Sequence, residues 1–120
     1  MNLISKQYDK TEVQITSFQS SKGITEYHIF FQQTDCMEDF HSQLQHIQDV
    51  YMRCAEELPG NPVAIFRRYF LSDVTNQTDK LMERERLFPY CALSIVQQAP
   101  MNGTKIALWA WLQTGVQTQV

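Results

Sequence analysis

The chain has 120 residues, of which 43% are hydrophobic and 19% are charged, and its formal net charge is −3. A chain of this length forms one domain, residues 1–120, with a single core, and its charge balance provides no basic surface for nucleic acid. No stretch approaches the ~20 apolar residues of a membrane span, and the N-terminus lacks the apolar run of a signal peptide. The three cysteines have neither the spacing of metal ligands nor that of a disulfide framework, so we expect no metal site and no disulfide framework. We also expect no other cofactor and a cytoplasmic location.

The first half of the chain predicts two strands and a helix. Residues 11–18 and 24–33 are rich in β-branched and aromatic residues and predict a hairpin around the turn at residues 20–23. Asp35 is expected to begin a helix, with Glu38 three residues later in a variant of the capping box. Apolar residues recur at helical spacing and predict one buried stripe: Phe40, Leu44, Ile47, Tyr51, Cys54 and Leu58.

The second half predicts a strand, a helix and two further strands. Residues 63–71 form the strand, and a helix from about residue 75 to 87 carries Leu81 and Met82 and ends before Pro89. Residues 91–99 and 104–112 are predicted to pair as a hairpin, because Asn102-Gly103 suits the positive φ angles of a type I′ turn. The predicted order is ββαβαββ, an α+β fold with one mixed sheet and two helices on one face.

The predicted strands are apolar on both faces, and two helices can cover only one face. The turn places Leu93, Ile95, Ile106, Leu108, Ala110 and Leu112 on one surface and Ala92, Val96, Ala107, Trp109 and Trp111 on the other. In residues 63–71 the expected faces are Val63, Ile65 and Tyr69 against Ala64, Phe66 and Phe70. Because large exposed apolar patches mark interfaces, we predict that another subunit covers the second face. The alternative is that loops and the N-terminal segment fold over it.

Three motifs in the second half carry a family resemblance. The strand Val63-Ala64-Ile65-Phe66-Arg67-Arg68-Tyr69-Phe70-Leu71-Ser72-Asp73, Phe88-Pro89 before the next strand, and Pro100 before the last strand occur in the order and spacing of the RidA/YjgF family. The resemblance covers roughly residues 47–112. It implies the fold shared with small bacterial chorismate mutases and a homotrimer with ligand pockets between subunits.

The same resemblance implies that the family's deaminase residues are replaced. The family arginine that holds the substrate carboxylate follows a Pro-Ala pair, and Pro89-Tyr90-Cys91 puts Cys91 at that position. The glutamates of the family's last strand correspond to Ala107 and Trp109, and the family asparagine of the second helix corresponds to Leu81. We therefore expect no imine deaminase activity.

Two functions from different classes remain open. The first is a noncatalytic small-ligand-binding or scaffold domain; the alternative is an enzyme acting on a small carboxylated metabolite in a cleft between subunits. Residues 70–77 also resemble longer chorismatase-like relatives that carry two domains of this fold, so the chain is compatible with an amino-terminal domain of such a protein. The candidate ligand-binding residues are Arg67, Arg68, Asp73, Tyr90, Cys91 and Trp109.

Several of these residues also have a structural interpretation. Arg67 and Arg68 point to opposite faces of a strand, so at least one should be partly buried and paired with Asp73, Glu56 or a ligand anion. Cys91 is expected to be a buried thiol rather than a nucleophile, because no histidine lies near it in the sequence. The helix histidines His41 and His46 do not share a face, so we do not expect them to bind a metal.

Overall fold

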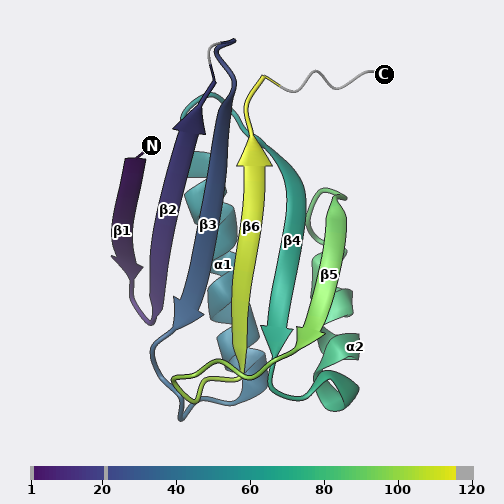
Figure 1. The fold of residues 1–120 in the computed structure, drawn as a ribbon. Coiled ribbons are helices and arrows are strands. Elements are labelled where there is room, and N and C mark those ends of the chain that lie inside the picture. Colours follow the sequence, from purple (N-terminus) through teal and green to yellow (C-terminus); the bar gives the residue numbers. More distant parts are fainter. Residues whose placement is uncertain (1, 21, 116–120) are drawn as a thin grey trace.

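A computed structural model of the chain describes residues 2–20 and 22–115; Met1, Ser21 and residues 116–120 lie outside the described residues. Six strands form one mixed sheet in the order β1-β2-β3-β6-β4-β5, with β4 and β5 parallel and all other neighbours antiparallel. Both helices lie on the same face of this sheet (Figure 1), which confirms the predicted α+β class. The elements are β1 Asn2–Tyr8, β2 Thr11–Gln19, β3 Thr25–Gln33, α1 Phe40–Glu57, β4 Val63–Leu71, α2 Val74–Glu85, β5 Ala92–Gln97 and β6 Ile106–Gln113.

Strand β1 adds an element that the sequence prediction missed, so the order is βββαβαββ rather than ββαβαββ. It pairs with β2 from Asn2↔Ser17 to Tyr8↔Thr11, and Asp9 takes a positive φ of 51° in the turn between them. Every residue of β1 before Tyr8 is exposed. The sequence of β1, Asn-Leu-Ile-Ser-Lys-Gln-Tyr, has no regular alternation of apolar and polar residues that would predict a strand.

The predicted hairpin of the last two strands is wrong. β5 is an edge strand that pairs in parallel with β4, whereas β6 lies between β3 and β4 (Figure 1). Only Gly103 of the expected turn has a positive φ, 84°, and the Asn102 side-chain amide instead donates to the Gln33 carbonyl oxygen at 2.8 Å. A strand that is apolar on both faces, as β6 is, buries more surface in the centre of a sheet than at its edge. The helix α2 then makes β4 and β5 a parallel crossover pair.

The predicted faces of β6 are nevertheless correct, because alternation does not depend on which strand is the neighbour. Ile106, Leu108, Ala110 and Leu112 are buried on the helix side. In β4 a bulge between Ala64 and Phe66 changes the alternation, so Ala64 shares the helix face with Tyr69 instead of opposing it.

Each helix has an aspartate as its N-cap, and the start of α1 differs from the predicted one. α1 begins at Phe40 rather than near Asp35, because the Asp39 carboxylate accepts the Ser42 N–H at 2.8 Å as the N-cap. Asp73 caps α2 and accepts the Asn76 N–H at 3.3 Å. The predicted stripe of α1 contributes Leu44, Ile47, Tyr51 and Cys54 to a core completed by Val13, Ile15, Tyr27, Ile29, Phe31, Tyr69, Leu71, Leu81, Ile106, Leu108, Ala110 and Leu112.

Candidate functional site

The sheet face opposite the helices, which we call the open face, carries a group of apolar side chains outside the core. The strand registers arrange its residues in three rows that cross the sheet from β1 to β5. These rows are Leu3, Thr16, His28, Trp111, Phe66 and Ala92; Ser5, Gln14, Phe30, Trp109, Arg68 and Ser94; and Gln7, Glu12, Gln32, Ala107, Phe70 and Val96. The central strands β3, β6 and β4 therefore present aromatic side chains, and the outer strands present mostly polar or small ones.

The aromatic rings of the open face contact one another. The His28 ring stacks on Trp111 with a centroid distance of 5.8 Å and an interplanar angle of 11°, and Phe18 meets His28 edge-on at 5.5 Å. Trp109 lies 5.7 Å from Phe66 and 5.5 Å from His28. Most of these rings are half-buried although the helices lie on the other face. Such a surface is suited to burial against another apolar surface or to stacking on flat rings.

Arg68 provides the positive charge of this face. Its guanidinium carbon lies 5.2 Å from the Phe66 ring centroid, and its Nε donates to Ser94 Oγ at 3.3 Å. Within residues 2–20 and 22–115 no carboxylate lies within salt-bridge distance of Arg68, and its side chain is exposed. Its charge is therefore free to meet an anion from outside the chain.

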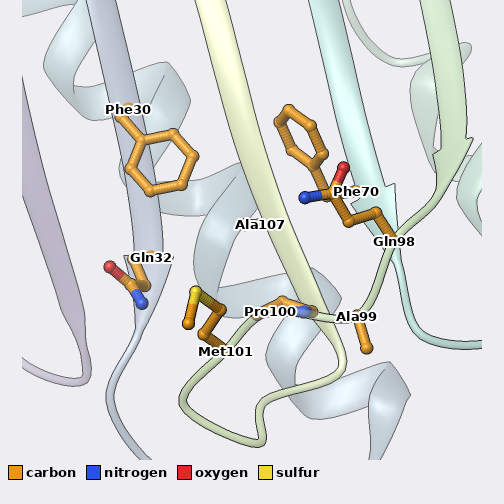
Figure 2. Close-up of a pocket in the computed structure, with 8 residues that line it drawn as sticks. All are labelled: Phe30, Gln32, Phe70, Gln98, Ala99, Pro100, Met101 and Ala107. Atoms are coloured by element: carbon orange, nitrogen blue, oxygen red, sulfur yellow. The ribbon is translucent and has the colours of Figure 1, made fainter.

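A hollow of about 300 Å³ lies on the open face where the segment after β5 passes the start of β6. Figure 2 shows Phe30 and Phe70 on either side of β6, with Ala107 between them and Pro100 and Met101 below. The side-chain amides of Gln32 and Gln98 complete the wall with Ala99. We call this hollow the Ala107 pocket.

Arg67 lies on the opposite, helix-covered face and is 2% exposed. Its Nη2 pairs with Glu85 Oε1 at 2.8 Å and donates to the Pro89 carbonyl oxygen at 3.1 Å, and its Nη1 donates to Tyr51 Oη at 3.0 Å. The predicted ion pair of a strand arginine therefore exists, but its acid is Glu85 and not Asp73 or Glu56. A guanidinium held by three groups of its own chain has little capacity left for a ligand.

Tyr69 closes this buried cluster. Its hydroxyl donates to Glu85 Oε2 at 2.5 Å and accepts from Gln48 Nε2 at 3.3 Å. Burial, and then the adjacent Glu85 carboxylate, raise the pKa of Tyr69 well above its ordinary value, so the hydroxyl remains a donor. Both oxygens of Glu85 are occupied, which indicates a structural role for the cluster.

The remaining predicted residues are spread over the molecule. Asp73 is engaged as the N-cap of α2, Tyr90 is 99% exposed in the segment before β5, and Trp109 lies on the open face. Burial raises the pKa of the Cys91 thiol, although Arg67 opposes the shift, so Cys91 is a poor nucleophile at neutral pH. Within one chain the structure brings Arg68 and Trp109 together as neighbours in one row, and places Arg67 on the other face.

Sequence reasoning missed Glu85 and the Ala107 pocket. Glu85 could have been found, because Gln77, Leu81 and Glu85 are four residues apart and share the buried face of α2. The pocket left no such signal, because its walls come from β3, β4, β6 and residues 98–101.

Residues 2–20 and 22–115 contain neither a metal-binding cluster nor a membrane-spanning helix. No group of three or more histidine, cysteine, aspartate or glutamate side chains there is arranged to hold a metal ion. None of the described helices is long and apolar enough to cross a membrane. In comparisons with known proteins, no protein-family model and no curated protein matches the sequence.

Proposed function

We propose that this chain is a noncatalytic RidA/YjgF-like oligomerisation domain that forms a homotrimer through its open face. The observation that carries the proposal is the one-sided arrangement of the fold: both helices cover one face of the sheet, and the other face carries a continuous group of aromatic rings. Exposed apolar surfaces of this kind usually serve association. A second copy is the partner implied by the family resemblance.

The charges of the open face support a second copy as the partner. Arg68 lies on β4, whereas Glu12 and Glu26 lie on β2 and β3 on the same face. In a closed ring of three subunits each contact joins two different patches of the chain. The β4 side of one subunit can then meet the β2–β3 side of the next, which brings unlike charges together.

The state of the candidate catalytic groups supports a noncatalytic role. Arg67 forms a buried ion pair with Glu85, and the raised pKa of the Cys91 thiol keeps it protonated at neutral pH. Ala107 and Trp109 stand at the positions that correspond to the family's acids. The described cysteines are free thiols, which fits a reducing compartment such as the cytoplasm.

A second candidate function is the binding of a small carboxylated metabolite between subunits. The specific observation in its favour is Arg68, an exposed guanidinium that has no carboxylate partner within the described part of its own chain. A bidentate contact from this arginine would be the anchor of such a ligand.

Light scattering of the purified chain tests the oligomerisation proposal. The expected mass is about three times 14.1 kDa at micromolar concentration. Trp109→Lys places a charge in the centre of the open face and should yield monomers, because burying an unpaired charge is costly. The matched control is Leu87→Lys, a 71% exposed apolar residue outside the open face, which should leave the trimer intact.

Three results would contradict the proposal. They are a monomeric wild-type chain, a dimer, and a trimer that survives Trp109→Lys but not Leu87→Lys. Circular dichroism of each variant separates loss of association from loss of folding.

A further inference from the structure

We infer that the Ala107 pocket binds a neutral, flat heterocycle that carries a lactam-type edge, with an N–H donor beside a carbonyl acceptor. This inference goes beyond the proposed function, because every wall of the pocket belongs to one chain. It also differs in ligand chemistry from the carboxylated metabolite considered above.

The shape of the pocket follows from one small residue between large ones. Ala107 pairs with Gln32 on β3 and with Phe70 on β4, and its methyl group is much shorter than these side chains, so a hollow remains beside it. The Phe30 and Phe70 rings contact each other edge to face at the wall of this hollow, with centroids 6.3 Å apart and planes inclined at 69° (Figure 2). A flat ring that enters the hollow can contact this aromatic pair from one side. The volume of about 300 Å³ suits a ring system of one or two rings.

The polarity of the pocket selects a neutral ligand. None of its eight lining residues is charged, and the nearest charged neighbour along the same row is the acid Glu12, which pairs with Gln32. An anionic ligand would therefore lose its hydration next to a carboxylate and gain no cation in the pocket. Arg68 lies in the adjacent row and is directed to Phe66 and Ser94.

The two glutamines supply the hydrogen-bonding groups. Each carboxamide offers an N–H donor and a carbonyl acceptor, and over residues 2–20 and 22–115 neither Gln32 nor Gln98 has a side-chain hydrogen bond. A lactam edge has the complementary donor and acceptor. Met101, whose side chain is fully exposed at the mouth, provides a flexible thioether wall that adapts to a ring.

The test uses quinazolinone as a neutral bicyclic lactam and quinaldate as an anionic bicycle of similar size. Each is titrated into the full chain and followed by saturation-transfer NMR and calorimetry. We expect saturable binding of quinazolinone and binding of quinaldate weaker by about tenfold or more, because a buried charge without a partner is strongly disfavoured.

Ala107→Leu fills the floor and should abolish quinazolinone binding. Ala92→Leu makes the same change on the open face outside the pocket and should leave binding unchanged. Gln32→Leu and Gln98→Leu preserve the floor and should each weaken binding by about fivefold or more, since one ligand group is left unpaired. These two variants decide the matter if Ala107→Leu does not fold.

Absence of saturable binding to the monomeric protein, equal binding to Ala107→Leu, or preference for quinaldate would each overturn the inference. The proposed trimer covers the open face, so a wild type that light scattering finds to be trimeric is replaced in the titrations by Trp109→Lys, whose altered residue does not line the pocket. A wild-type monomer that binds quinazolinone contradicts the trimer alone, and a wild-type trimer whose Trp109→Lys monomer does not bind it contradicts the pocket alone.

Discussion

In the buried cluster, Arg67 has a structural role, although the sequence suggested it as a candidate ligand-binding residue. Arg67 lies under the helices with Glu85, Tyr51 and the Pro89 carbonyl as partners. Its guanidinium carbon also lies 5.3 Å from the Tyr51 ring centroid and 5.4 Å from that of Phe88. The cluster therefore joins β4, both helices and the segment before β5. A buried charge with this set of partners fixes positions but adds little net stability over an apolar core.

The first prediction is that removing Glu85 strongly destabilises the protein. Glu85→Ala leaves the Arg67 charge buried without its carboxylate, which typically costs about 3–5 kcal/mol in the free energy of unfolding. Urea denaturation followed by circular dichroism measures this loss. Glu83→Ala, an exposed position on the same helix, should stay within about 0.5 kcal/mol of the wild type. A loss below about 1 kcal/mol for Glu85→Ala would show that Arg67 reaches water or another acid.

Elements were predictable from the sequence where their pattern is local. The α1 stripe and the two faces of β6 follow from side-chain periodicity, which is independent of the neighbouring strand. Which strands pair with one another, however, depends on segments that are distant in the sequence. Asn102-Gly103 favoured a hairpin, but β6 gains more by entering between β3 and β4, where Ala107 and Leu108 are both buried. The bulge after Ala64 and the exposed strand β1 depend on tertiary pairing in the same way.

The second prediction tests the strand order by cross-linking. Arg68 and Ser94 are partners in the parallel ladder, so a cysteine pair at these positions should oxidise to a disulfide. Counted back from the predicted two-residue turn Asn102-Gly103, the hairpin would instead pair Ser94 with Trp111. In the structure β4 separates these two strands by roughly 10 Å, which is beyond disulfide reach.

The two designs are compared in a background without the native cysteines. Arg68→Cys/Ser94→Cys is expected to cross-link under mild oxidation, and Ser94→Cys/Trp111→Cys is not, as read by mass spectrometry and thiol titration. The opposite result would favour the hairpin arrangement.

At the scale of the whole molecule, the open face could be predicted from the sequence, but the Ala107 pocket could not. Trp109 and Trp111 could be assigned to a second apolar face because the last strand alternates apolar residues on both sides. The Ala107 pocket arises only when the chain after β5 crosses to the start of β6, beside strands that are distant in the sequence. The proposed association through the open face and the proposed ligand binding in the pocket therefore both depend on the assembled sheet rather than on any one motif.

The last prediction is that the protein does not accelerate imine hydrolysis. The proposed RidA/YjgF resemblance places Cys91 where the family arginine holds the substrate carboxylate, and Ala107 and Trp109 where the family's acids stand. Arg67 cannot replace the missing arginine from its buried pair with Glu85. Loss of such a bidentate contact typically costs about 2–5 kcal/mol, or roughly 30-fold to several thousand-fold in rate, before loss of the acid is counted.

The measurement generates aminoacrylate with a dehydratase and follows its decay with and without the protein. An active family member serves as the positive control, and Cys91→Ser should give the same background rate as the wild type. An acceleration comparable to that of the positive control would mean that another group anchors the carboxylate. Arg68 would be that group, because it is the exposed guanidinium on the open face, and Arg68→Gln would then abolish the activity.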